Sequence, residues 1–342
     1  MLDNLDTIAK YDNHNALGVI AGQPEQLKHA CELPKREWGE VRQVVLAGMG
    51  GSALAAQFLS NWLGSRLPVP LIIVRDYDLP EYIGPETLLI ASSYSGNTEE
   101  TRAALAEARK RGAQVAVLTS GGQLEEQAEA HDLQLLETPS GLQPRLAVLY
   151  SVRAIAQLLE AVGLVEHLVV ELESAADWMM GELAAWLADS PTSSNQAKQI
   201  AERLLGFTVI IYGGPALAMP TMKWKIDINE NAKNLAFFNV LPEFDHNEFI
   251  GWANPVEKAV RVVELQSSLD RPRINQRFEL SNRLLSGSMP EPIIVQAKGT
   301  TRLQQMLWTI ILGDFVSAYL AFLNGIDPTP VELVEKLKKE LG

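Results

Sequence analysis

Short apolar runs alternate with helix-like stretches through the first half of the chain, and this alternation limits the fold more than any other feature. Four runs are clear, at 44–47, 71–74, 88–91 and 115–118, and a fifth is expected at 132–136. The stretches between them are rich in residues that favour helices. Strands that alternate with helices form parallel βαβ units. We therefore predict a doubly wound α/β sheet with helices on both faces.

The second half of the chain repeats this plan in pattern rather than in identity. A strand at 208–212 runs into the glycine turn 213–215 and a helix at 216–229. Further strands are expected at 235–238, 259–265 and 292–296. A chain of 342 residues is long enough for two domains with separate cores. We predict two doubly wound, mainly parallel-sheet domains, 1–165 and 166–342, related by a weak internal duplication.

Several helices are expected outside these repeats. Residues 1–34 look helical, and a helix at about 168–188 would link the halves. The longest apolar stretch, 307–323, is interrupted by Asp314 and Ser317, so we expect a helix buried in protein rather than a membrane span.

Charge and composition exclude some classes of function. The net charge is −13 and no basic stretch stands out, which argues against nucleic acid as a partner. The single cysteine, Cys31, allows no intramolecular disulfide and no thiolate metal cluster. The first ten residues lack the apolar core of a signal peptide. We expect a cytoplasmic protein in a reducing compartment, with no membrane association.

A turn crowded with hydroxyl groups, Ser93–Glu100, follows the predicted strand 88–91 and precedes a helix. Thr98 or Asn97 can cap that helix, and the two glutamates suit its positive end. Free backbone N–H groups, hydroxyls and the helix dipole together favour a phosphate ligand. A well-capped helix on a polar loop explains the local sequence equally well.

A glycine-rich turn follows the first predicted strand. Gly48–Ala53 satisfies G-x-G-x-x-A, and Asp76 follows the next strand, which is compatible with dinucleotide binding. The glycines could instead let the backbone approach a sugar, or let a strand and a helix pack closely.

Three polar stretches of the second half could carry chemistry. Glu230 shares a helical face with Lys223 and Asp227, and an ion pair on a solvated face is the favoured local interpretation. His246 lies between Asp245 and Asn247, which could orient it for proton transfer, although a structural histidine is about as plausible. A metal site formed by His246 and Glu248 lacks a third ligand. The lysines of the last helix, 331–341, usually mark a solvated face.

Taken together and in order, these motifs resemble the bifunctional phosphoglucose/phosphomannose isomerase family, which is built from two sugar isomerase (SIS) domains. The resemblance covers residue 40 to the end. It rests on six motifs: Gly-Met-Gly-Gly-Ser, Ser-Tyr-Ser-Gly-Asn-Thr, Gln-Pro-Arg, Asn-Glu-Asn-Ala-Lys, Glu-Phe-Asp-His-Asn-Glu and Asn-Gly-Ile-Asp-Pro-Thr-Pro-Val. The implied fold is a pair of flavodoxin-like SIS domains, and the implied assembly is a homodimer whose active sites lie between subunits.

The resemblance also implies roles for individual residues. Glu230 would be the base, Arg145 would stabilise the enediolate, and His246, expected from the partner subunit, would open the sugar ring with Lys338. Lys336 is the alternative lysine. The substrate-binding residues would be Gly50, Gly51 and Ser52 along the sugar, and Ser93, Ser95 and Thr98 around the phosphate.

The implied reaction interconverts fructose 6-phosphate with glucose 6-phosphate, and with mannose 6-phosphate, through a cis-enediol without a metal or other cofactor. A carboxylate can move the proton between C1 and C2, and a guanidinium keeps its charge beside the enediolate. The alternatives are a non-catalytic phosphosugar regulator, an isomerase of another sugar phosphate and a nicotinamide-dependent dehydrogenase.

Overall fold

The computed structural model describes residues 1–254 and 259–341, without the side chains of 338, 339 and 341. The chain forms two compact units: a first unit of residues 23–177, and a second unit of residues 1–22 and 178–342. The division therefore differs from the expected one at residue 165. The N-terminal 22 residues belong with the C-terminal half, and the boundary falls within helix α8 (Leu168–Glu182).

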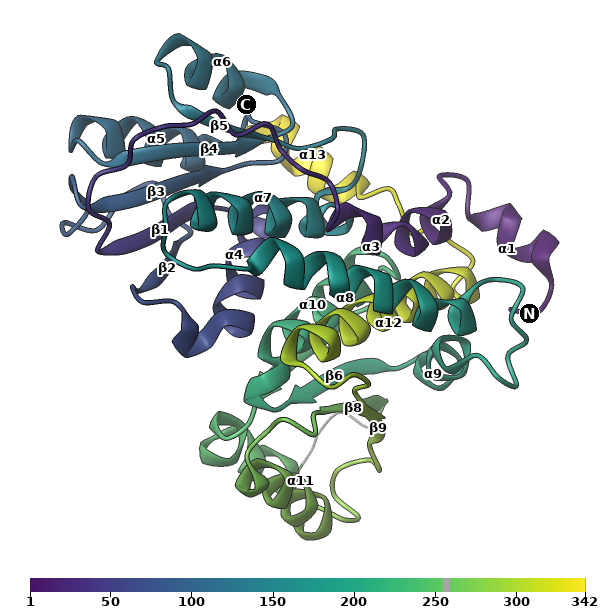
Figure 1. Ribbon diagram of the computed structural model, residues 1–342. Helices are drawn as coiled ribbons and strands as arrows, with labels where there is room; N and C mark the ends of the chain where they lie inside the picture. Colours follow the sequence, from purple (N-terminus) through teal and green to yellow (C-terminus); the bar gives the residue numbers. More distant parts are fainter. Residues whose placement is uncertain (255–258, 342) are drawn as a thin grey trace. The chain divides into compact units, whose positions relative to one another are not determined.

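The first unit contains one fully parallel sheet of five strands in the order β2-β1-β3-β4-β5 (Figure 1). The strands are β1 (Gln43–Gly48), β2 (Leu71–Val74), β3 (Thr87–Ser92), β4 (Gln114–Thr119) and β5 (Gln134–Glu137). The helices are α3 (Gln23–Gln26), α4 (Gly50–Leu63), α5 (Glu99–Lys110), α6 (Gly122–Ala130) and α7 (Val148–Ala161). The doubly wound α/β prediction is confirmed for this half.

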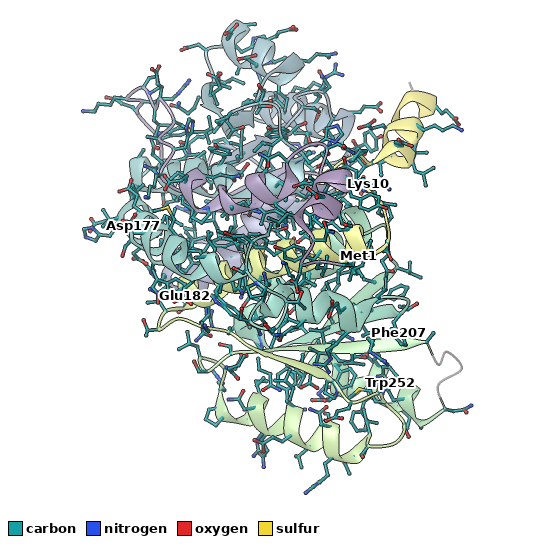
Figure 2. All side chains as sticks on the ribbon, turned by 90° about the vertical axis from the view of Figure 1, so that its right-hand side faces the viewer. Met1, Lys10, Asp177, Glu182, Phe207 and Trp252 are labelled. Atoms are coloured by element: carbon teal, nitrogen blue, oxygen red, sulfur yellow. The ribbon has the colours of Figure 1, made fainter. Side chains whose placement is uncertain are left out.

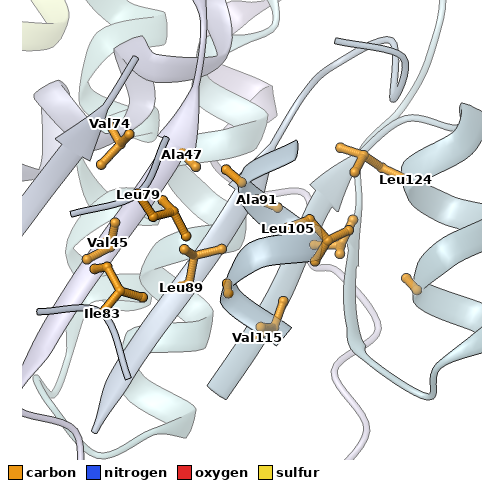
Figure 3. Packing of buried hydrophobic residues seen from close by; sticks show 14 residues of the cluster. Val45, Ala47, Val74, Leu79, Ile83, Leu89, Ala91, Leu105, Val115 and Leu124 are labelled. Carbon is orange, nitrogen blue, oxygen red and sulfur yellow. The ribbon is translucent and has the colours of Figure 1, made fainter. Parts of the chain in front are cut away.

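Alternate residues of the strands face the two sides of this sheet, as the period of a β-strand requires. Val45 and Ala47 of β1, with Leu89 of β3, pack against Leu105 of α5 and Leu124 of α6 in one buried apolar cluster (Figure 3). The strands are apolar on both faces because both faces are covered, which is typical of parallel sheets.

The second unit repeats the topology with one strand fewer, in the order β7-β6-β8-β9 and again fully parallel. Its strands are β6 (Thr208–Gly213), β7 (Ala236–Val240), β8 (Val260–Gln266) and β9 (Ile293–Gln296). Its helices are α1 (Leu5–Tyr11), α2 (Ala16–Ala21), α9 (Gln196–Leu204), α10 (Ala218–Glu230), α11 (Pro272–Leu284), α12 (Arg302–Leu323) and α13 (Glu332–Leu341). The expected recurrence of the strand–glycine–helix plan is thus confirmed at the level of strand order.

Helix α12 is the core helix of the second unit, in contact with α2, α9 and α10. By length and composition it would qualify as a membrane span, but 94% of its apolar window is buried within the protein. The sequence expectation of a protein-buried helix is confirmed.

The expectation that residues 1–34 are helical is only partly correct. Helices α1, α2 and α3 are short, and no helix is assigned from Leu27 to Arg42. Cys31 lies in this irregular segment, where its thiol donates to the Glu137 carbonyl at 3.1 Å. Burial raises the pKa of this thiol to about 11, so it is not a reactive thiolate.

Candidate active site

The first sheet reverses its strand order between β1 and β3, because β2 lies on one side of β1 and β3, β4 and β5 lie on the other. In open α/β sheets, ligands bind outside the carboxyl ends of the strands at such a switch point. The glycine turn after Gly48 and the hydroxyl loop after Ser92 both start there, and these two residues pair in the sheet. The topology therefore brings together the two loops that the sequence singled out.

The hydroxyl loop is held by short internal hydrogen bonds. Ser93 Oγ and Thr98 Oγ1 lie 2.7 Å apart, and Gly96 N donates to the Ser93 carbonyl at 3.0 Å. Ser95 is exposed. Thr98 occupies the N-cap position of α5, as predicted, but its side chain does not cap the helix. The first N–H groups of α5 have no acceptor within the helix, so they remain available to an anion beside these hydroxyls.

Tyr94 fixes the hydroxyl loop to its surroundings. Its amide donates to Ser52 Oγ at 3.0 Å, which joins the hydroxyl loop to the glycine turn. Its phenol donates to the Pro139 carbonyl at 2.8 Å and accepts from Leu142 N at 3.0 Å. The loop is thus preorganised from three directions, and sequence analysis gave Tyr94 no role.

The glycines of the first turn serve close packing. A Cβ on Gly48 would lie 2.7 Å from the Ser92 carbonyl oxygen, and one on Gly51 would lie 2.9 Å from the Pro144 carbonyl carbon. Gly50 has a φ of +49°, a conformation that glycine adopts without strain. The closeness at Gly51 allows the 3₁₀ turn η2 (Pro144–Leu146) to approach the site loops.

Arg145 belongs to that turn and is 2% exposed. Its Nη1 donates to Gln143 Oε1 at 3.3 Å. A Cβ on Gly51 would lie 3.1 Å from the Arg145 amide nitrogen, so the arginine backbone lies directly above the glycine turn. The structure therefore brings Gly50, Gly51, Ser52, Ser93, Ser95, Thr98 and Arg145 to one edge of the first sheet.

Glu230 is the last residue of α10 in the second unit and is half-buried. It lines a mainly apolar cavity of about 690 Å³, between the end of α10 and the residues that precede and begin α13. Lys233, with a φ of +49°, donates to the carbonyls of Asp327 and Pro328 at 2.9 and 3.0 Å and so joins the two walls of this cavity.

The expectation that Lys223, Asp227 and Glu230 form a solvated face is wrong for the first two residues. Lys223 Nζ contacts both Asp227 carboxylate oxygens at 2.6 and 2.7 Å and Asp314 Oδ1 at 2.7 Å. The three side chains are 0–1% exposed. Asp314, which interrupts the apolar run of α12, provides the second anion. A lone acid in a buried helix requires a buried cation, and that signal was present in the sequence.

The charged groups of this triad shift one another's pKa values. Burial is the main cause that raises the pKa of Asp227, and the Asp314 carboxylate raises it further, while Lys223 lowers it; the net shift is upward. Burial lowers the pKa of Lys223, but the two carboxylates outweigh burial and the net shift is upward. The triad therefore holds a charged lysine directly beneath the last turns of the helix that carries Glu230.

His246 is exposed at the end of the 3₁₀ turn η5 (Glu243–His246), and its neighbours are engaged elsewhere. The Asp245 carboxylate accepts from Arg277 at 2.6 Å. The Asn247 side chain accepts from Glu248 N and donates to the Glu243 carboxylate. Neither residue therefore makes a contact that supports the expected orientation of the imidazole. The interactions instead fix the segment around His246 to the second unit.

The carboxylate of Glu248, the residue whose pairing with His246 at a metal lacked a third ligand in the sequence, is engaged by two other side chains. It accepts from Tyr212 Oη at 2.5 Å and from Asn239 Nδ2 at 2.8 Å. The indole NH of Trp252, marked in Figure 2, donates to the same phenol oxygen at 3.0 Å. Burial raises the pKa of Tyr212, and Glu248 raises it further. Within residues 1–254 and 259–341, no group of three His, Cys, Asp or Glu side chains could hold a metal ion.

Lys338 lies on α13, but its side chain is outside the described residues. The alternative lysine, Lys336, is exposed and lies 3.9 Å from Glu340. Helix α13 also exposes apolar side chains, with Leu333 85% and Leu337 59% exposed.

Comparison with known proteins agrees with this architecture. Residues 40–161 match the family model of the SIS domain, and residues 193–341 match that of the bacterial phospho-glucose isomerase C-terminal SIS domain. A glucose-6-phosphate isomerase like protein from Thermus thermophilus has the same fold, with a TM-score of 0.67 at 19% identity, over 99% of this chain and 98% of that one.

Two curated relatives are similar over almost their whole length. The bifunctional phosphoglucose/phosphomannose isomerase of Caldicellulosiruptor bescii is 36% identical over 93% of this chain and 96% of its own. The protein of the same name from Aquifex aeolicus is 34% identical over 89% of this chain and 94% of its own. The strand order and the two family models define a protein of two SIS domains. More specifically, the chain belongs to the bifunctional phosphoglucose/phosphomannose isomerase family.

Proposed function

We propose that this chain interconverts fructose 6-phosphate with glucose 6-phosphate and with mannose 6-phosphate through a cis-enediol. The observation that carries the proposal is the preorganised hydroxyl loop at the switch point of the first sheet, with the Arg145 backbone next to it. Membership of the isomerase family supports the same reaction class.

Ser93, Ser95 and Thr98 would bind the substrate phosphate. The paired hydroxyls of Ser93 and Thr98 reorient at no conformational cost to the backbone, and the first amides of α5 add charge-dipole stabilisation. Gly50, Gly51 and Ser52 would lie along the sugar, where a side chain on Gly51 would displace η2. The phosphate is remote from the reacting carbons, so its binding energy orients them.

Glu230 would transfer the proton between C1 and C2, and the Arg145 guanidinium would stabilise the enediolate oxygens. Glu230 lies half-buried at the wall of a mainly apolar cavity, and a carboxylate in that position can act as a general base toward a ligand in the cavity. Arginine keeps its positive charge through the cycle, so it stabilises negative charge without competing for the proton. Reprotonation on either face of the planar enediol would give the two C2 epimers.

His246 and Lys338 would open the sugar ring, with His246 contributed by the partner of a homodimer. Support comes from the surface around His246. Strand β7 is an edge of the second sheet. Large apolar side chains on and beside β7 and in the turn that follows η5 are exposed, namely Leu235 (61%), Phe237 (52%), Phe238 (39%) and Ile250 (75%). Exposed apolar side chains on an edge strand are typical of an interaction surface. We place the enzyme in the cytoplasm.

The test is product formation from fructose 6-phosphate by the purified chain, with glucose 6-phosphate and mannose 6-phosphate each identified by NMR. Formation of both supports the dual specificity, and glucose 6-phosphate alone restricts the enzyme to one epimer. Phosphosugar binding without turnover would instead support the non-catalytic regulator. Protection against heating by NAD, and not by phosphosugar, would support the dehydrogenase.

A further inference from the structure

The second sheet has a switch point equivalent to the one beside the hydroxyl loop, and we call the region outside its strand ends the second crevice. Its strand order reverses between β6 and β8, and Gly213 pairs with Leu265 as Gly48 pairs with Ser92. Six residues, 93–98, separate β3 from α5, and five residues, 267–271, separate β8 from α11. The two halves therefore present loops of similar length at equivalent switch points, although their sequences differ.

In the second crevice, the polar groups that could bind a ligand already bind one another. Asp270 Oδ1 accepts from Ala216 N at 2.9 Å, at the start of the segment that leads into α10. Ser267 Oγ donates to Gln305 Oε1 at 2.5 Å, and Gln305 Nε2 donates to Ser268 Oγ at 2.8 Å. Asp270, Ser267 and Gln305 are 8%, 1% and 1% exposed.

The position of Asp270 is the decisive observation. A Cβ on Gly214 would lie 2.0 Å from its Oδ2, so the carboxylate occupies the space directly above the glycine turn. Within the described residues, this buried Oδ2 has no hydrogen-bond partner. A carboxylate that accepts from the backbone N–H of Ala216 in this turn can take the place of a bound anion, and its charge opposes the entry of another.

We propose that Asp270 is a built-in anion that closes the second crevice to phosphorylated ligands. The proposal concerns a crevice that the proposed reaction does not use. Each chain then binds one phosphate group, at the loop 93–98, although it carries two copies of the same topological site.

Equilibrium dialysis with radiolabelled inorganic phosphate tests the proposal. In the wild-type chain we expect one phosphate per chain, and none in the S93A/T98V variant. Adding D270G to S93A/T98V removes the carboxylate and should restore one phosphate per chain. D270N keeps the side-chain volume and an acceptor for Ala216 N but removes the charge, so the matched variant S93A/T98V/D270N should bind phosphate measurably, although more weakly than S93A/T98V/D270G. D189A, at an exposed acid of the same unit, is the control for unspecific loss of negative charge.

Two results would overturn the proposal: phosphate bound by S93A/T98V at the second unit, or a folded S93A/T98V/D270G chain that binds none. If D270G does not fold, hydrogen exchange on the wild-type chain decides. With saturating glucose 6-phosphate, amides of 94–99 should exchange more slowly, while those of 214, 216, 217 and 267–270 keep their exchange rates. Slower exchange at the amides of the second crevice would contradict its closure by Asp270. If no amide slows, the proposed function fails, and this outcome is separate from a failure at Asp270.

Discussion

Removing the buried lysine of the second unit should be among the most damaging single substitutions in this chain. Lys223→Met leaves Asp227 and Asp314 facing each other, with no exposed area, without the ammonium group that both carboxylates contact. Breaking a buried ion pair by deleting one partner costs about 3–5 kcal/mol of unfolding free energy. With an m value of about 2–3 kcal/mol per molar urea, the midpoint of the transition falls by about 1–2.5 M.

The assay is urea denaturation followed by tryptophan fluorescence, since Trp224 is adjacent in sequence and packs on α12. Lys298→Met is the matched control, because Lys298 is 64% exposed and lies 3.6 Å from Glu182. Its midpoint should not move, as expected for a surface pair. The variant K223M/D227N/D314N should recover part of the loss because no buried charge remains. A K223M midpoint equal to that of the wild type would refute a buried, charged triad.

The pH dependence of this loss has a defined sign. Asp227 has a folded-state pKa raised above its ordinary value of 3.8, so its protonated form is stabilised in the fold. Such a group adds stability at low pH that is lost as the pH rises through the folded-state pKa. Without Lys223 the shift grows, so the deficit of K223M relative to wild type should shrink when the pH is lowered from 8 to 5. A deficit that widens on acidification would contradict this assignment.

Three predictions concern activity. Gly51→Ala should lower kcat by displacing the segment of Arg145, whereas Gly84→Ala, where a Cβ meets nothing within 4 Å, should leave kcat unchanged; steady-state assays compare them. Thr98→Val should raise KM for sugar phosphates and weaken inhibition by inorganic phosphate, because it removes a hydroxyl of the phosphate loop, and equal inhibition of both forms would contradict that role. His246→Ala should slow turnover of cyclic substrates more than that of an open-chain one, and an equal loss on both would exclude ring opening.

The sequence was sufficient for the fold of each half and for the loops of the first site. Strand–helix alternation and the turn residues are local signals, and the parallel topology then places the loops after Gly48 and Ser92 at one edge. Contacts between segments distant in sequence were not predictable. Lys223 meets Asp314 across 91 residues, and Asp270 meets Ala216 across 54. The helix pattern could assign Lys223 and Asp227 to one face, but only packing against α12 makes that face buried.

Contacts between distant segments also explain why the sequence did not predict the surroundings of His246 or the irregular structure of residues 27–42. Asp245 and Asn247 adjoin His246 in sequence, yet Arg277 and Glu243 bind them, so adjacency did not predict orientation. Residues 27–42 have helix-forming composition in part, but no helix is assigned there. The segment begins after Pro24 and contains Pro34, which disfavours a continuous helix.

The central claim is that Glu230 transfers a proton between C1 and C2 of the substrate, with an enediol as the intermediate. The most direct measurement is NMR of fructose 6-phosphate turned over in heavy water by the wild-type chain and by Glu230→Gln. The account predicts deuterium at C2 of the aldose products of the wild-type chain. It also predicts no exchange in the variant, which still binds the phosphosugar. Exchange at the wild-type rate in Glu230→Gln, or product free of deuterium after many turnovers, would contradict it.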